Sequence, residues 1–253
     1  MVFEVKDIDY RYSDGTAALE TVSFSIEAGE RIAILGANGS GKSTLLRILN
    51  GLLFPSSGSI LFRGEELSEK SLDNPKFRQE FRQGVGFVFQ NADAQLFNAT
   101  VFEEVAFGPR QIGLTEPEVV VRVRDVLGFL GIDHLAERPP FRLSGGEKRK
   151  VAIASILSMN PDVLILDEPF LGLDPRSQTW LIATLRQLNE AGKTTIVATH
   201  TLATVPRIAD RALVLSEDHT TVAIGAVSDL LNDTGLLRRA NLIEDGEGVR
   251  FEI

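Results

Sequence analysis

Cysteine is absent from the 253 residues of this chain. Its absence excludes disulfide bonds, thiolate metal sites and a thiol nucleophile, and it is typical of a cytosolic protein. No stretch of about 18 uncharged apolar residues occurs, so we expect no membrane-spanning helix. The first six residues also lack the basic and then apolar layout of a signal peptide, and we expect no export signal.

Histidine is scarce, with three residues, and acidic residues outnumber basic ones by 35 to 26. The net charge of −9 argues against broad binding to nucleic acids, and we expect no nucleic-acid partner. His134 and His219 lie in polar, loop-like surroundings, which predicts surface positions. A hydrophobic content of 43% and a charged fraction of 24% are typical of a soluble globular protein.

The most informative segment that is present covers residues 36–43, Gly-Ala-Asn-Gly-Ser-Gly-Lys-Ser. It matches the pattern G-x-x-x-x-G-K-[ST], with a predicted buried strand before it (31–35) and a predicted helix after it (43–49). The glycines let backbone N–H groups approach phosphate, Lys42 can reach the β and γ phosphates, and Ser43 can ligate Mg²⁺. The alternative is a glycine-rich turn at a helix start, which the strand–loop–helix context disfavours.

The order of strand and helix signals predicts an α/β fold. Alternating apolar residues over 2–12 and 21–26 indicate half-buried strands, which we expect to form an antiparallel layer against a nucleotide-binding core. Further strands are expected at 58–62, 85–89, 163–166, 194–199, 211–215 and 222–224, and a helix at 177–191. Alternation of this kind implies a mainly parallel sheet with helices on both faces.

From about residue 100 to 143 the apolar residues take a helical spacing, which predicts a helical insertion between core strands. Residues 116–130 have helical apolar spacing, and 147–159 continue as a helix. We expect a nucleotide-binding domain over 2–230, with a helical subdomain at about 98–160. A short C-terminal tail is expected over 231–253, and the segment from residue 228 onward is expected to carry one helix and a loose end.

Asp167 and Glu168 follow the apolar run 163–166, at the carboxyl end of a predicted parallel strand. Adjacent carboxylates at such a position are costly unless Mg²⁺, water or cations engage them. Beside a phosphate loop, Asp167 is the natural Mg²⁺ ligand and Glu168 can act as general base toward water. The alternative is a carboxylate pair that is simply solvated at the strand end.

A second candidate anion site lies at residues 143–147, Leu-Ser-Gly-Gly-Glu, just before a predicted helix. Ser144, Gly145 and Gly146 would offer a hydroxyl and backbone N–H groups at the start of that helix. The alternative is ordinary helix capping, because Ser144 and Glu147 also match the S-x-x-E capping box. Both interpretations can hold together.

Taken in order, these motifs resemble those of the nucleotide-binding subunits of ABC transporters, over nearly the whole chain. Residues 36–43 correspond to the Walker A motif and 163–168 to the Walker B motif. Residues 143–147 resemble the LSGGQ signature, with Glu147 in place of the usual glutamine. We expect this replacement to have little effect on phosphate contacts, since Ser144 and both glycines remain.

Single residues between these motifs extend the resemblance. Tyr12 resembles the aromatic residue that stacks on adenine, with Tyr10 as its nearest competitor. Gln90 resembles the Q-loop glutamine, Asp174 belongs to a D-loop-like segment, and His200 resembles the switch histidine. His200 is followed by Thr201, where the family commonly has an aspartate.

The resemblance implies an ATPase that uses Mg²⁺ and works as a dimer, with each ATP between one subunit's Walker A motif and the other's signature. The implied catalytic residues are Glu168, His200, Gln90 and Lys42. The implied nucleotide-binding residues are Tyr12, Gly36, Asn38, Gly39, Ser40, Gly41, Lys42, Ser43, Thr44, Ser144, Gly145, Gly146 and Asp174. The implied metal ligands are Ser43, Gln90 and Asp167.

Residues 87–98, 105–109 and 149–154 are similar to the ATPases of energy-coupling factor transporters, which import cobalt, nickel or vitamins. This similarity implies a second ABC ATPase subunit, identical or related, a transmembrane coupling protein and a substrate-capture membrane protein. It also implies a peripheral position at the cytoplasmic face of the cell membrane, with Gln95 and Leu96 on the coupling surface.

Two other functions compete with transport. The first is a soluble ABC ATPase of DNA repair or translation with no membrane partner, but such proteins usually carry coiled-coil or tandem insertions, which this chain lacks. The second is an interaction module that binds ATP and hardly turns it over. The presence of Glu168 and His200 argues against that module.

Overall fold

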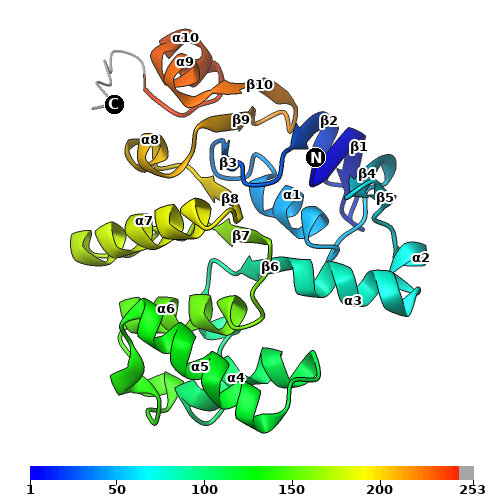
Figure 1. Cartoon of the computed structure of the whole chain (residues 1–253). Helices are drawn as coiled ribbons and strands as arrows, with labels where there is room; N and C mark the ends of the chain where they lie inside the picture. Colours follow the sequence, from blue (N-terminus) through cyan, green and yellow to red (C-terminus); the bar gives the residue numbers. More distant parts are fainter. Residues whose placement is uncertain (245–253) are drawn as a thin grey trace.

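The computed structural model describes residues 1–244, in which two sheets are surrounded by helices (Figure 1). The larger sheet has the strand order β10-β9-β3-β8-β7-β6. Its strands are β3 (Arg31–Leu35), β6 (Val85–Val88), β7 (Val163–Asp167), β8 (Thr194–Thr199), β9 (Arg211–Leu215) and β10 (Thr221–Ala226). Only β10 runs antiparallel to its neighbour, so the predicted mainly parallel sheet is confirmed.

The smaller sheet is antiparallel and has the order β2-β1-β4-β5. Its strands are β1 (Phe3–Arg11), β2 (Ala17–Ile26), β4 (Ser57–Phe62) and β5 (Glu65–Glu66). Buried Phe3, Val5 and Ile8 from β1 join a core cluster that also contains Ile32 and Ile34 from β3. The N-terminal strands therefore pack on the parallel sheet as expected.

The strands of the larger sheet are buried on both faces, which explains their continuous apolar sequences. In β3, Ile32 and Ile34 belong to one core cluster, while Ala33 and Leu35 belong to the other. Successive side chains of a strand point to opposite faces, so a single short strand contributes to both cores. The surrounding helices include α1 (Lys42–Leu49), α3 (Pro75–Gly84), α7 (Pro175–Glu190) and α8 (Val205–Ile208).

Three helices lie between β6 and β7 in the sequence: α4 (Val101–Gln111), α5 (Glu116–Leu130) and α6 (Gly145–Leu157). Figure 1 shows them grouped together at the bottom of the view, away from the antiparallel sheet. Helix α5 has the predicted bounds and buries the predicted apolar face. Helix α6 begins two residues earlier than expected, because Ser144 and Glu147 form a reciprocal capping box.

Several short elements escape the sequence analysis. They are α2 (Glu69–Leu72), α3, α10 (Thr234–Arg239) and the 3₁₀ turns η1 (Ala92–Ala94), η2 (Asp133–Leu135), η3 (Pro140–Arg142) and η4 (Leu202–Thr204). The one helix expected from residue 228 onward is α9 (Val227–Asn232). Helix α3 is mostly polar and is held by two phenylalanines: Phe81 meets Phe62 of β4, and Phe77 stacks on Phe81. The C-terminal segment forms two helices rather than one, and residues 245–253 of the expected tail lie outside the described part.

Within residues 1–244, no helix is both long enough and apolar enough to cross a membrane.

The start of β4 generates a test of how closely β4 packs against β1. Gly58 has φ +80°, and a Cβ there would approach the backbone oxygens of Lys6 and Asp7 to 2.4 Å. We predict that Gly58→Ala lowers the free energy of unfolding in urea by about 2–4 kcal/mol, since backbone strain and a clash with main-chain atoms add together.

Gly64→Ala is the matched control, because Gly64 has φ +86° but a Cβ added to it would meet no atom within 4 Å. It isolates the left-handed backbone cost, which we expect to be about 1–2 kcal/mol. Equal losses in the two variants would contradict the predicted clash at Gly58.

Candidate nucleotide site

Three chain segments meet at the carboxyl ends of β3, β8 and β7, which are adjacent in the sheet. Residues 36–43 follow β3, His200 follows β8, and Asp167 and Glu168 lie at the end of β7. Ligands of open α/β sheets bind at this edge. The topology thus brings together residues that are up to 164 positions apart in the sequence.

The loop between β3 and α1 requires glycine at defined positions. Gly41 has φ +100°, and a Cβ there would lie 2.1 Å from the carbonyl oxygen of Ala18. A Cβ at Gly36 would lie 2.3 Å from Ser40 Oγ. Ser40 itself is fully buried and its hydroxyl has no hydrogen-bond partner within the described residues. An unpaired buried hydroxyl in such a tight loop suits an oxyanion ligand.

Lys42 is 6% exposed and anchors the loop. Its Nζ donates hydrogen bonds to the carbonyl oxygens of Gly36 (2.8 Å) and Ala37 (2.9 Å). The same nitrogen lies 3.8 Å from Glu168 Oε1. Burial lowers the pKa of Lys42, and the carboxylates of Glu168 and Asp167 oppose that shift.

Asp167 and Glu168 are both buried, at 4% and 6% exposure, so the interpretation as a solvated pair is wrong. Ser43 Oγ donates to Asp167 Oδ1 at 3.0 Å. Burial raises the pKa of Asp167, while the hydrogen bond from Ser43 opposes the rise. A cation beside these oxygens would relieve the cost of burying the carboxylate.

The donor set at Asp167 fits Mg²⁺. Residues 1–244 contain no group of three or more histidine and carboxylate side chains able to hold a metal ion by themselves. One carboxylate and one hydroxyl, with phosphate oxygens and water completing the shell, is the set that Mg²⁺ uses at nucleotide sites. We therefore retain Ser43, Gln90 and Asp167 as the proposed metal ligands.

Glu168 connects the end of β7 to His200. Its Oε1 lies 2.8 Å from His200 Nδ1, and its backbone N–H donates to Ala198 O at 2.9 Å. The residue has φ +43°, an uncommon conformation for a non-glycine residue. Strained residues of this kind cluster at functional sites, where the surrounding contacts hold them in place.

A cavity of about 380 Å³ lies in front of the loop. Its lining includes the predicted residues Tyr12, Asn38, Gly39, Gly41, Lys42, Ser43, Thr44, Gln90 and Glu168. Tyr12 is held in place because its hydroxyl shares a hydrogen bond of 2.7 Å with Thr44 Oγ1. The ring of Tyr10 meets Tyr12 edge-on at 5.2 Å and does not line the cavity, which favours Tyr12 as the adenine contact.

Ser144, Gly145, Gly146 and Asp174 do not line this cavity. Ser144 caps α6, where its backbone N–H and hydroxyl both donate to Glu147 Oε2 at 2.8 Å. These bonds lower the pKa of Glu147. Asp174 caps α7, and its Oδ1 accepts hydrogen bonds from the N–H groups of Arg176 and Ser177. The helix-capping alternative is thus realised, and the residues of the predicted second anion site lie outside the chain's own cavity.

Four residues that line the cavity were not predicted from the sequence: Thr16, Ala17, Ala18 and His219. The first three follow the turn after Tyr12, where Tyr12 N–H donates to Thr16 O at 2.9 Å, so the turn signal could have located them. His219 was expected at the surface and is half-buried. No local signal places it here, because its position depends on a bond from Glu20 N–H to its carbonyl oxygen.

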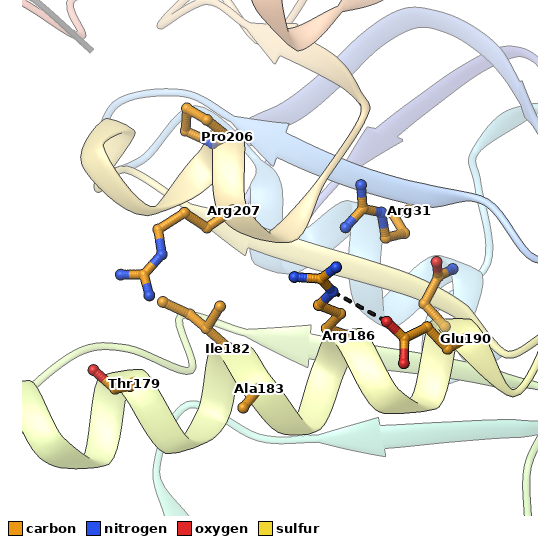
Figure 2. Close-up of a pocket in the computed structure, with 9 residues that line it drawn as sticks. Arg31, Thr179, Ile182, Ala183, Arg186, Glu190, Pro206 and Arg207 are labelled. Atoms are coloured by element: carbon orange, nitrogen blue, oxygen red, sulfur yellow. Dashed lines mark hydrogen bonds and ion pairs between the residues drawn. The ribbon is translucent and has the colours of Figure 1, made fainter. Parts of the chain in front are cut away.

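A second cavity, of about 620 Å³, lies between α7, α8 and β3 and contains none of the predicted site residues. Figure 2 shows Arg186 paired with Glu190 on α7, with Arg31 nearby and Arg207 projecting from α8. Arg31 is itself held by Asp210 through two hydrogen bonds. Two arginines of this cavity, Arg186 and Arg31, are therefore paired with the chain's own carboxylates.

The fold and the loop define a P-loop nucleotide-binding protein. A profile of the family described as "ABC transporter" matches residues 19–171, which is more than half of the chain. The chain belongs to the ABC transporter family, and it is an ATPase of that family.

Curated relatives agree with this assignment. The chain is 50% identical to a putative ABC transporter ATP-binding protein, TTE0246, of Caldanaerobacter subterraneus, over 96% of this chain and 99% of the relative. It is 42% identical to the energy-coupling factor transporter ATP-binding protein EcfA of Methanothermobacter thermautotrophicus, over 95% of this chain and 76% of the relative.

Solved structures agree as well. CbiO1 from Clostridium perfringens, part of the ABC transporter complex cbiONQ, superposes with a TM-score of 0.81 at 40% identity, over 95% of this chain and 94% of CbiO1. The dimeric ATP-binding cassette MJ0796, in a post-hydrolysis state bound to ADP and Pi, gives a TM-score of 0.80 at 28% identity, over 89% of this chain and 98% of the cassette.

The position of Glu168 generates a test of catalysis. Glu168→Gln keeps an oxygen that His200 can bond but removes the basic carboxylate, so we predict unchanged ATP binding with hydrolysis slowed by about 10²–10⁴-fold. Phosphate release and equilibrium binding of ATP are the measurements. Near-normal ATP turnover in Glu168→Gln would show that Glu168 is not the general base.

Glu190→Gln is the control for this experiment. It removes an exposed carboxylate that pairs with Arg186 outside the nucleotide cavity, and we expect unchanged turnover.

Proposed function

We propose that this chain is the ATP-hydrolysing subunit that powers import through separate membrane proteins, in an energy-coupling factor transporter for cobalt, nickel or a vitamin. Its 42% sequence identity to EcfA and its structural similarity to CbiO1 support membership of the energy-coupling factor group. The ATPase domain would cover 2–230, with the helical part at about 98–160. The subunit would lie at the cytoplasmic face of the membrane.

The observation that carries the proposal is the buried Glu168 carboxylate between Lys42 and His200. A water beside Glu168 would give its proton to this carboxylate while attacking the terminal phosphate of ATP. His200 holds the carboxylate in place, and Lys42 offsets the negative charge that accumulates on the phosphoryl oxygens. Mg²⁺, when bound, supplies further charge neutralisation on the β and γ phosphates.

The exposed signature residues support a dimer with a second ATPase subunit, either another copy or a related chain. Ser144 and Gly145 are exposed at the start of α6 and outside their own nucleotide cavity. The backbone N–H groups at that helix start can bind the terminal phosphate of a nucleotide held by the partner. Asp174, at the start of α7, lies on the same side, because a Cβ at Gly146 would meet Ser177 Oγ at 3.1 Å.

The shared site leads to a prediction about dimerisation. In the Glu168→Gln background, Ser144→Arg should leave ATP binding to the single chain intact and abolish ATP-dependent dimerisation, since a long charged side chain would fill the shared phosphate site. Light scattering with and without ATP is the measurement.

Thr115→Arg is a matched control. Thr115 caps α5 through the same kind of capping box with Glu118, is also exposed, and lies outside the nucleotide cavity. We expect normal dimerisation in this variant. Unchanged dimerisation in Ser144→Arg as well would contradict the shared site.

A groove beside Gln90 supports docking of a membrane partner. The groove has a volume of about 680 Å³ and lies between Leu52, α3, β6 and the ends of α4 and α6. Its lining combines apolar Leu52, Phe89 and Met159 with basic Arg78 and Arg82. Phe89 lines the groove, and the next residue, Gln90, lines the nucleotide cavity, so two consecutive residues connect the groove to the cavity.

Gln95 and Leu96, expected on the coupling surface, do not line this groove. The Gln95 amide instead donates to Ala152 O (2.8 Å) and Ser155 Oγ (3.2 Å) of α6. Their contact with a partner stays a prediction.

Affinity purification from native membranes in mild detergent tests the proposed function. We expect the chain to bring with it a small polytopic membrane protein and a substrate-capture membrane protein, identified by mass spectrometry. Leu52→Arg should lose these partners while ATP binding is retained, because a charge replaces one of the apolar side chains of the groove. Phe141→Arg, at a position that is 76% exposed outside the groove, is the control. Recovery without any membrane protein would favour the soluble ATPase.

A further inference from the structure

Arg149 carries a buried positive charge that forms no ion pair with Asp167 or Glu168 and makes no hydrogen bond to the phosphate loop. It lies on α6, five residues after Ser144, and is 6% exposed. Within residues 1–244 no carboxylate forms an ion pair with it. Burial lowers its pKa, and the charge of Asp167 opposes that shift. A buried guanidinium without a carboxylate partner is costly, so its hydrogen bonds must matter to the fold or to function.

The guanidinium donates to two consecutive carbonyl oxygens. Arg149 Nη1 lies 2.8 Å from Phe89 O, and Nη2 lies 2.7 Å from Gln90 O. Two parallel bonds from one planar group fix both the position and the orientation of the backbone they bind. The peptide that carries the Gln90 side chain toward the nucleotide cavity is therefore attached directly to α6.

Two more polar links join the same segment to α6. Lys148 Nζ pairs with Asp93 Oδ1 at 2.5 Å, near the start of the helix. Gln95 bonds Ala152 O and Ser155 Oγ through its amide, and its Oε1 accepts from Phe89 N–H at 3.2 Å. Residues 89–95 thus lie along α6, but among these linking side chains only Arg149 is buried and reaches the backbone of Gln90.

We infer that Arg149 is a positioning residue that makes the Gln90 backbone and the start of α6 move as one unit. It bonds no nucleotide and acts through Gln90 and Ser144. A contact at Gln90 with the chain's own nucleotide then sets the orientation in which Ser144 is presented to the partner's nucleotide. This inference rests on the proposed shared site. It adds the residue that ties the two nucleotide sites to each other.

The experiment measures ATP binding to the single chain separately from ATP-dependent dimerisation. In Arg149→Met, ATP should bind the single chain with an affinity within about twofold of the unsubstituted chain, because no nucleotide contact is lost. The ATP concentration needed for dimerisation in the Glu168→Gln background should rise by about tenfold or more, and in the otherwise unsubstituted chain kcat should fall by a similar factor. Both effects follow from the loss of two charge-assisted bonds to the Gln90 segment.

Arg149→Lys tests whether the two parallel hydrogen bonds of the guanidinium are needed, and it remains informative if Arg149→Met does not fold. It keeps the charge but cannot bond two carbonyls in one plane, so we expect kcat to fall by about threefold or more. Lys148→Met is the control, because it removes only a more exposed ion pair from the neighbouring position, and we expect a kcat within about twofold. Circular dichroism melting confirms that each variant is folded.

Three results would overturn the inference: Arg149→Met dimerises and turns over normally, its affinity for ATP falls as much as its dimerisation, or Arg149→Lys is fully active. If the Glu168→Gln chain that retains Arg149 fails to dimerise in ATP, the proposed shared site fails instead. The two failures are therefore distinguishable.

Discussion

The Glu168 carboxylate, held between Lys42 and His200, is the interaction on which the rest of the site depends. Its oxygen lies 2.8 Å from His200 Nδ1 and 3.8 Å from Lys42 Nζ, at the end of a strand that is buried throughout. Lys42 in turn fixes the phosphate loop through two carbonyl bonds, and Asp167 fixes Ser43. Neutralisation of these buried charges by one another keeps the site assembled.

Each part of the fold contributes different residues to the nucleotide site. The parallel sheet supplies the charges and the loop, and the antiparallel layer supplies Tyr12 and the side of the cavity. The helices between β6 and β7 supply Ser144, which does not enter that cavity. Donors placed around a phosphate stabilise the charge that develops on it, so the proposed second subunit would complete each site by adding its own signature residues.

The sequence predicted the parts of the structure that carry strong local signals. The phosphate loop, the buried runs of β7 and β8 and the periodic helix α5 lie where they were expected, and most of the predicted nucleotide contacts line one cavity. Helix α3 was missed because two phenylalanines on a polar segment give little periodicity. The surface position predicted for His219 was wrong and the contact of Arg149 with Gln90 was not predicted, because the surroundings of both residues come from distant strands and loops, which no local pattern encodes.

The absence of cysteine offers the most direct measurement of the central claim, that two chains share each ATP. One population would carry Asn38→Cys and a second, differently tagged population would carry Ser144→Cys. The mixed populations would be treated with a short bifunctional thiol reagent. The account predicts a cross-link between the two tags that forms with ATP and not without it. A yield that does not depend on ATP, measured at concentrations where ATP binds, would contradict it.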